Sequence, residues 1–335
     1  MTSTCSPLLR NLTKISTRRL LSRPKHVLSK SLATVSEPTP QRALRRTSSH
    51  VDPVAAAMPP GYKARVGNLQ TFELPEKLTG GPGDRALGRA LVDAWRKDGI
   101  LQISMGAINS KLAETAFACS KKYFSMPFKE KAACIDDQSF AGYIASGEEI
   151  TNNIADYSEI FTVTKDLPLS DPRVQAKWPC HGPCPWPNSQ MRGIVQAYMD
   201  SLGDSGEKLL ELVAYGLGLE DGNALKRYTQ DGWHHLRVLR FPERHNVNGE
   251  GKDGRGIGSH TDYGLLVIAA QTNVGGLFIR PPYEDEKFAN WKKSAAGLKE
   301  DDDGWVYVPP VPGVFTVFPG KQIPKYIWVL FTLHD

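Results

Sequence analysis

The sequence predicts an α+β protein in which a helical N-terminal region precedes a β-sandwich or barrel core. Helical spacing of apolar residues is found in the first part, and short apolar or alternating runs follow Gly232. Hydrophobic residues make up 40% of the 335 residues and charged residues 23%, which is typical of a globular chain with enough apolar material for a core. We find no apolar run long enough to cross a bilayer.

The chain divides by charge into a basic N-terminal extension and a slightly acidic body. Residues 1–50 contain ten Lys and Arg against the single acid Glu37, which leaves 31 basic and 35 acidic residues for the body. An Arg- and Ser-rich, acid-poor segment with scattered leucines is typical of a mitochondrial presequence, and a disordered tail has a similar composition. We therefore expect a cytoplasmic protein, or a mitochondrial one if the extension is a working presequence.

Charge and cysteine content also bound the partners. Because no basic stripe remains in the body, we expect neither nucleic acid nor a membrane as a partner, and we expect a monomer that binds small molecules. The five cysteines form no even framework, which indicates a reducing, intracellular protein (Cys5, Cys119, Cys134, Cys180 and Cys184).

We divide the chain into four regions: an extension with a linker (1–60), a mainly helical region (66–230), a core (231–320) and a tail (321–335). The globular part is expected to begin near Asn68.

Three helices and one strand are predicted in the N-terminal region. Apolar residues recur with helical spacing from Asp84 and stop at Gly99 (Leu87, Ala90, Leu91, Ala94 and Trp95). A short strand at 100–103 follows, and a second helix at about 109–124 ends before Pro127. The region 204–219 shows the third helical pattern.

Five short strands are predicted after Gly232, at 235–241, 261–271, 276–280, 305–308 and 314–318. Each is an apolar or alternating run, and Gly, Pro, Asn and Asp separate the runs.

The sharpest local signal is the triplet His260-Thr261-Asp262 at the start of a predicted strand. Residues i and i+2 of a strand point to the same face, so this imidazole and carboxylate can converge on one metal ion. Non-haem Fe(II) oxygenases use two histidines and one carboxylate on one face of the metal. A surface His and Asp at a strand entrance is the alternative interpretation of the triplet alone.

The residues around the triplet resemble a known family. The strings RGIGSHTDYGLLVIAAQ at 255–271, VGGLFIR at 274–280 and PGVFTVFPG at 312–320 are similar to the core of the 2-oxoglutarate/Fe(II) dioxygenases of the isopenicillin-N-synthase-like group. Further strings resemble the ethylene-forming type within that group: NLQTFELP at 68–75, AGYIASGEEIT at 141–151, EIFTV at 159–163, WPCHGP at 178–183 and DGWHHLRVLRFP at 231–242. The resemblance runs from about Asn68 to Gly320 and implies a double-stranded β-helix (jelly-roll) core preceded by a helical region.

The resemblance also implies a reaction. Fe(II) is the cofactor, and 2-oxoglutarate and O2 are consumed. In the main branch 2-oxoglutarate gives ethylene and CO2, and in the other it gives succinate while L-arginine is hydroxylated and released as guanidine and a pyrroline carboxylate. A related dioxygenase that hydroxylates another small molecule is an alternative, as is a non-catalytic remnant that only binds ligands.

The family positions assign roles to individual residues. His260 and Asp262 are the metal ligands, Arg237 and Phe241 stand at cosubstrate positions, and Glu149, Thr151, His235 and Tyr263 stand at arginine positions. From the strand pattern, Arg237 shares a face with Leu239 and Phe241, so a cation could meet an anionic ligand in an apolar pocket, with a surface ion pair as the alternative.

Two features stand apart from this assignment. Cys180-His181-Gly-Pro-Cys184 has the spacing of a partial zinc site, but no second Cys/His pair lies at a suitable distance, and the resemblance implies a structural turn.

After Gly320 the family continues into an Asp-led strand, a third histidine ligand and an Arg-x-Ser pair that binds 2-oxoglutarate, whereas residues 321–335 follow another pattern. His334 is the candidate third ligand, although Pro324 argues against a matching strand. We therefore expect a C-terminally incomplete core that makes no ethylene, with intron read-through as one explanation.

Overall fold

The computed structural model describes residues 64–104, 106–137, 139–151, 153–229, 234–242, 256–262, 264–280 and 304–320. All of them belong to one unit, Asp52–Asp335, and the other unit, Met1–Val51, lies outside the described residues. The predictions for the extension, for Tyr263 and for His334 with the tail also fall outside them.

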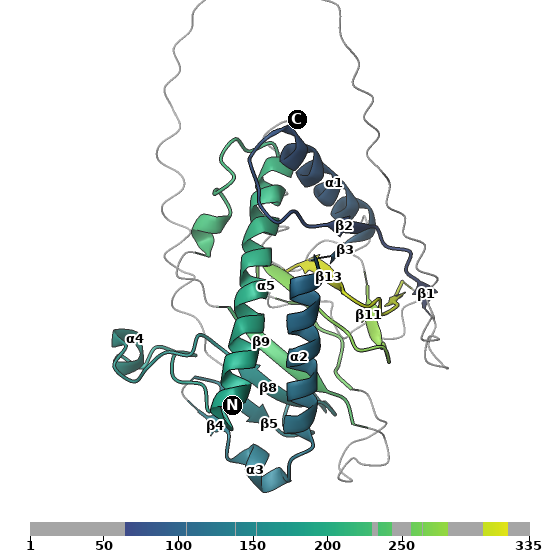
Figure 1. Cartoon of the computed structure of the whole chain (residues 1–335). Coiled ribbons are helices and arrows are strands. Elements are labelled where there is room, and N and C mark those ends of the chain that lie inside the picture. Colours follow the sequence, from purple (N-terminus) through teal and green to yellow (C-terminus); the bar gives the residue numbers. More distant parts are fainter. Residues whose placement is uncertain are drawn as a thin grey trace, which may run out of the picture. The chain divides into compact units, whose positions relative to one another are not determined.

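Three long helices cover the sheets: α1 (Pro82–Asp98), α2 (Gly106–Phe124) and α5 (Ser189–Gly216). Two short helices, α3 (Phe128–Ala132) and α4 (Pro172–Gln175), and a 3-10 turn, η2 (Lys226–Tyr228), complete the helical elements that the structure describes. Figure 1 shows α1 and α2 beside α5, and both pack against it. None of the described helices combines the length and the apolar character needed to span a membrane.

The first two helices lie close to their predicted positions, whereas the third begins fifteen residues earlier than predicted. α1 ends at Gly99, whose φ of 72° is left-handed and suits glycine. α5 begins after Asn188, whose side chain accepts a 2.9 Å hydrogen bond from the Met191 amide. The helical pattern predicted at 204–219 thus covers only the second half of α5.

Helices α1 and α5 approach each other at a pair of glycines. A Cβ on Gly88 would lie 2.1 Å from the carbonyl oxygen of Leu212, and a Cβ on Gly216 would lie 2.2 Å from the carbonyl oxygen of Gly88. Only hydrogen fits at this crossing, so the two helix backbones are in direct contact.

Two four-stranded sheets carry most of the strands. The first has the order β10-β13-β3-β2, formed by Leu266–Ala269, Val314–Pro319, Leu101–Ser104 and Thr71–Glu73. The second has the order β4-β5-β8-β9, formed by Ile135–Asp136, Ala141–Ile144, Glu159–Val163 and Leu236–Arg240. A three-stranded sheet (β1 Arg65–Val66, β12 Val306–Val308, β11 Leu277–Ile279) and a hairpin (β6 Ile150–Thr151, β7 Ile154–Ala155) complete the described set.

The strand predictions for the N-terminal region need correction. One strand was predicted there, at 100–103, and it corresponds to β3, but β1, β2 and β4–β8 were missed. Most of these strands are two to four residues long, and β8 is buried on both faces, so alternation could not reveal it. The globular part also starts before Asn68, because β1 pairs in parallel with β12.

Strand β9 has one face toward the core and the other away from it. Leu236 and Val238 pack against the cluster that holds Phe161 and Val163 of β8. Arg237 therefore lies on the opposite face, where the antiparallel register places Thr162 across from it.

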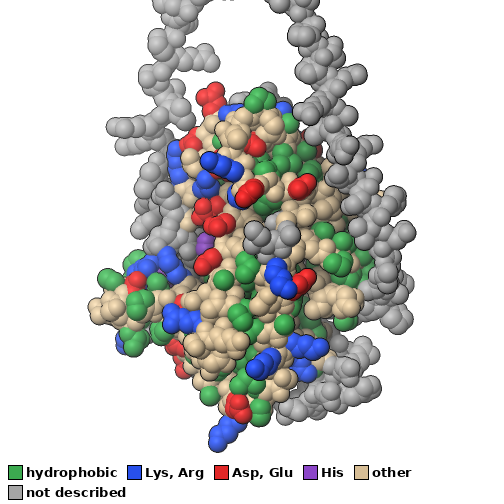
Figure 2. Space-filling model, in the orientation of Figure 1, with side chains coloured by type: hydrophobic (Ala, Val, Ile, Leu, Met, Phe, Trp, Pro, Cys, Tyr) green, Lys and Arg blue, Asp and Glu red, His purple; other side chains and the backbone are tan. Residues whose placement is uncertain are grey.

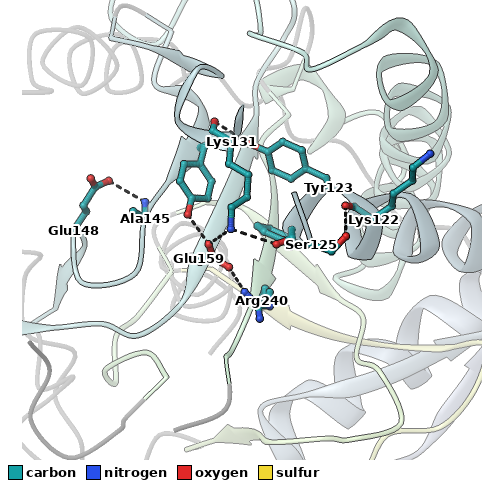
Figure 3. A network of polar contacts seen from close by, with 10 residues as sticks. Lys122, Tyr123, Ser125, Lys131, Ala145, Glu148, Glu159 and Arg240 are labelled. Atoms are coloured by element: carbon teal, nitrogen blue, oxygen red, sulfur yellow. Dashed lines mark hydrogen bonds and ion pairs between the residues drawn. The ribbon is translucent and has the colours of Figure 1, made fainter. Parts of the chain in front are cut away.

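A buried polar network fixes β9 from the core side (Figure 3). The carboxylate of Glu159, which is 6% exposed, accepts hydrogen bonds from Lys131, Tyr143 and Arg240, the last residue of β9. Burial alone would raise the pKa of Glu159, but the hydrogen bonds from Lys131, Tyr143 and Arg240 together lower it. The ionised carboxylate thus ties β9 to α3 and β5.

Candidate active site

His260 and Asp262 lie in a loop before β10, and the prediction that they stand on a strand is wrong. Within the predicted strand 261–271, only Leu266–Ala269 forms a strand, β10, and residues 258–262 are not in a strand. The two side chains nevertheless converge, with His260 Nε2 4.0 Å from Asp262 Oδ1. Both are partly exposed, at 47% and 38%.

The local contacts of His260 prepare one nitrogen for a metal. Its Nδ1 lies 2.9 Å from the carbonyl oxygen of Gly258 and must donate a hydrogen to it. Nε2 then carries the lone pair and points toward Asp262, the arrangement usual for metal-binding histidines. Neighbouring ligands of an octahedral ion with bonds of about 2.1 Å lie about 3 Å apart, so these two atoms, 4.0 Å apart, would have to approach by about 1 Å to bind one ion on one face. Among the described residues, no group of three possible ligands is present.

A buried carboxylate holds this loop in place. Asp156, directly after β7, is fully buried, and its Oδ1 accepts a 2.9 Å hydrogen bond from the Gly258 amide. Its Oδ2 accepts a hydrogen bond from the hydroxyl of Thr151. The Tyr157 amide also donates to the Gly256 carbonyl at 2.9 Å.

Arg237 and Glu149, assigned from the sequence to different ligands, contact each other directly. They form an ion pair in which the side chains are 31% and 30% exposed. In the part of the chain that the structure describes, the buried Nε of Arg237 and the buried hydroxyl of Thr162 have no hydrogen-bond partner. Unsatisfied buried polar atoms are costly, so this cross-strand pair suits an anionic ligand that accepts both hydrogens.

The two remaining predicted residues that the structure describes, His235 and Phe241, lie directly before and directly after β9. Phe241 follows β9, is 56% exposed, and its ring covers Gly256, where a Cβ would lie 2.5 Å from it. His234 and His235 are exposed. Tyr263 lies outside the described residues. The structure thus brings Glu149, Arg237 and, through Asp156, Thr151 and His260 into one connected set.

Asp156 and Thr162 were not identified from the sequence. Asp156 precedes Tyr157 in a stretch whose two-residue strands carry no periodic signal. Thr162 lies inside the fully buried strand β8, where a Thr is unremarkable as a β-branched residue. Each residue is recognised only in the structure, where Thr162 lies opposite Arg237 and Asp156 bonds to Gly258, partners about 75 to 100 positions away in the sequence.

The Cys180–Cys184 segment does not assemble a metal site in the described structure. The thiol of Cys184 is buried and contacts Thr164, while His181 Nδ1 donates to the Pro179 carbonyl at 2.8 Å. This agrees with a structural turn.

The face of the molecule shown in Figure 2 is mixed in charge. On the face shown in Figure 2, Lys and Arg side chains alternate with Asp and Glu side chains instead of gathering into one patch.

Comparison with known proteins identifies the class. Residues 70–189 match the family model described as "non-haem dioxygenase in morphine synthesis N-terminal". The chain is 50% identical over 256 residues to the 2-oxoglutarate-dependent ethylene/succinate-forming enzyme of Ralstonia nicotianae, covering 76% of this chain and 73% of the relative. It is 25% identical over 271 residues to a homoarginine-6-hydroxylase of Glycine max, covering 77% and 75%.

The fold is similar to that of a solved structure. A full-length Neurospora crassa protein in complex with alpha-KG superposes with a TM-score of 0.58 at 18% identity, covering 81% of this chain and 77% of the other. The class of the chain follows from its 50% identity to the Ralstonia enzyme over three quarters of its length, and the helices on mixed sheets agree with it. The chain belongs to the non-haem Fe(II)- and 2-oxoglutarate-dependent dioxygenases. Members of this family use Fe(II) and 2-oxoglutarate.

Proposed function

We propose that this enzyme forms ethylene and CO2 from 2-oxoglutarate and O2, and that in a second branch it forms succinate while hydroxylating L-arginine. The 50% identity to the Ralstonia enzyme supports the ethylene branch. The observation that carries the arginine branch is the ion pair of Glu149, which already binds a guanidinium group, that of Arg237. A carboxylate in this position can bind the same group of a free arginine.

Each residue has a defined task in this proposal. His260 Nε2 and Asp262 would hold Fe(II), and His334, outside the described residues, is the candidate third ligand. Bound Fe(II) supplies the oxidising chemistry once 2-oxoglutarate and O2 have joined it. Arg237 and Phe241 bind the cosubstrate, with the Nε of Arg237 donating to a carboxylate. Glu149, Thr151, His235 and Tyr263 bind L-arginine.

The proposal extends to architecture and cellular setting. We assign β9 to β13 to a jelly-roll core within residues 231–320, and the two four-stranded sheets add β2, β3, β4, β5 and β8 from the N-terminal region. The enzyme acts as a monomer, in the cytoplasm or in mitochondria.

A hydroxylase without the ethylene branch is the second candidate. The relative from Glycine max is a homoarginine-6-hydroxylase, so the same fold accepts a guanidino amino acid in that protein. Glu149 is suited equally to homoarginine and to arginine, because both present a guanidinium group.

Headspace ethylene separates these candidates. The chain as written and a chimera with the Ralstonia segment after Gly320 are each supplied with Fe(II), 2-oxoglutarate and O2, with and without L-arginine. Ethylene from the chimera supports the proposal, and ethylene from both forms assigns a third ligand within residues 321–335. Succinate with hydroxylated substrate but without ethylene, from either form, would establish the hydroxylase instead.

A further inference from the structure

We propose that Asp156 is a positioning residue that holds both the metal ligand His260 and the substrate hairpin, β6–β7, in one arrangement. The inference rests on the proposed function, because it takes His260 as a ligand of Fe(II) and Thr151 as a residue of the arginine site. Asp156 itself touches neither ligand.

The hairpin side of the anchor consists of side-chain and backbone contacts. Asp156 Oδ2 accepts the hydroxyl hydrogen of Thr151. The Asp156 amide donates to the Glu149 carbonyl at 2.8 Å, and the Asp156 carbonyl accepts from the Gly147 amide at 2.8 Å. The two proposed arginine-binding residues, Glu149 and Thr151, are therefore both bonded to Asp156.

The metal side of the anchor runs through a single residue. Gly258 donates its amide hydrogen to Asp156 Oδ1 at 2.9 Å and accepts from His260 Nδ1 at 2.9 Å. Gly258 is buried, so neither bond competes freely with water. The orientation of the imidazole thus depends on the position of the Gly258 carbonyl, which the carboxylate of Asp156 fixes through the same residue.

Because Asp156 is buried, loss of its hydrogen bonds is costly. Asp156 is 0% exposed, and a buried carboxylate is tolerated only where hydrogen bonds compensate its lost hydration. Removing it leaves the Gly258 amide and the Thr151 hydroxyl without this acceptor. Partners outside the ligand set that orient a metal-bound histidine typically change metal affinity by about 10–100-fold when they are removed.

The test measures the Fe(II) affinity of the full chain by anaerobic titration. Each variant is titrated below the melting temperature of its metal-free form, so that only folded protein is compared. We expect Asp156→Ala to weaken Fe(II) binding about 10–100-fold. Asp156→Asn, which keeps an acceptor for the Gly258 amide, should stay within about threefold of the wild type. Asp156→Glu should weaken Fe(II) binding about tenfold, because its longer side chain moves the carboxylate away from the Gly258 amide. This variant replaces Asp156→Ala in the test if the alanine variant does not fold.

Asp166→Ala is the matched control, because Asp166 is a second loop-bridging carboxylate away from the site. It accepts hydrogen bonds from the Cys184 amide at 2.8 Å and from Trp186 Nε1 at 2.9 Å. We expect this variant to lower the melting temperature but to leave Fe(II) affinity unchanged. Equal loss of affinity in both alanine variants would reduce Asp156 to a general stabiliser and overturn the inference.

A second measurement is independent of the metal. Amide hydrogen exchange in a peptide covering residues 256–262 of the metal-free protein should be faster in Asp156→Ala and unchanged in Asp166→Ala. Loss of Fe(II) binding in both the wild-type chain and the chimera with the Ralstonia segment after Gly320 would refute the proposed function. Wild-type protein that binds Fe(II), together with an alanine variant that binds it equally well, would refute this inference alone.

Discussion

His260 has a hydrogen-bonding pattern that a second histidine of the chain shares. His260 donates from Nδ1 to the carbonyl of Gly258, and His181 donates from Nδ1 to the carbonyl of Pro179, two residues before it in each case. His260 differs because Asp262 lies 4.0 Å from its Nε2. The paired carboxylate, not the histidine conformation, distinguishes the candidate metal site.

In the form that makes ethylene, His260→Ala and Asp262→Ala should each abolish iron-dependent turnover, since each removes one of the proposed protein ligands of Fe(II). His181→Ala is the control and should retain wild-type turnover, because His181 lies in the turn at 180–184. Ethylene and succinate release per iron added is the measurement. Turnover in either of the first two variants at the level of His181→Ala would contradict the metal assignment.

Arg237→Ala should weaken apparent binding of 2-oxoglutarate or L-arginine by more than the roughly 1 kcal/mol of an exposed ion pair. The reason is the buried Nε, which has no partner among the described residues and is available to a ligand. Apparent binding constants for both ligands are measured.

The exchanged pair Arg237→Glu with Glu149→Arg provides the control. It restores the ion pair and so should recover the melting temperature, while ligand binding stays weak because each charge is in the wrong place. Unchanged constants for both ligands in Arg237→Ala would refute the role of this arginine.

At the scale of elements, the α1–α5 crossing is the most constrained contact. Gly88→Ala should destabilise the protein by about 1–3 kcal/mol, because the new methyl group would lie 2.1 Å from the Leu212 carbonyl oxygen and the helices must separate. Gly193→Ala, in the exposed interior of α5 with no atom within 4 Å of its added Cβ, should instead stabilise by about 0.5–1 kcal/mol. Urea unfolding of the two variants measures both effects, and equal signs would contradict the packing argument.

The network around Glu159 should make stability depend on acid pH. Because the folded pKa of Glu159 is lowered below the ordinary value of 4.5, its contribution is complete above that value and is lost as the pH falls through the folded pKa. Glu159→Gln leaves Lys131 without its buried partner and should cost about 3–5 kcal/mol at neutral pH.

Melting temperatures between pH 3 and 7 measure the effect. The difference between Glu159→Gln and the wild type should shrink as the pH falls below about 4.5. Glu114→Gln, at an exposed pair with Lys111, should follow the wild-type curve throughout. A constant difference for Glu159→Gln would show that its charge does not stabilise the fold.

At the scale of the whole molecule, removal of Met1–Val51 should leave the melting temperature of the remainder unchanged, because the chain divides into units at that point. Removal through Gly67 deletes β1, with its 3.1 Å bond from Arg65 to Trp305 and its 2.8 Å bond from Gly67 to Tyr307. Loss of 1–2 kcal/mol would then lower the melting temperature by roughly 2–8 °C. Equal melting of the two truncated forms would contradict a role for β1.

Sequence patterns predicted the parts of this molecule that depend on near neighbours. The stripe of α1 and its stop at Gly99 are local, as is the His260–Asp262 spacing. The structure confirms the helix and places the two side chains 4.0 Å apart. The strand proposed around that pair was wrong, because Gly258 and Asp156 hold it as a loop. A strand of two residues is too short to show a periodic pattern. The Asp156 carboxylate could not be predicted either, because its partner Gly258 lies 102 positions away in the sequence.

Strand β3 lies between β2 and β13, and this arrangement affects how the chain folds during synthesis. Ile103 pairs with Phe315, more than 200 residues later, and both are almost completely buried. At about 5–20 residues per second, a ribosome needs roughly 10–40 s to supply the second strand after the first. During that time one edge of an apolar strand stays unpaired, which is the kind of surface that chaperones shield and that drives aggregation. The first sheet can therefore close only after β13 has been synthesised, when α1, α2 and α5 have had time to pack.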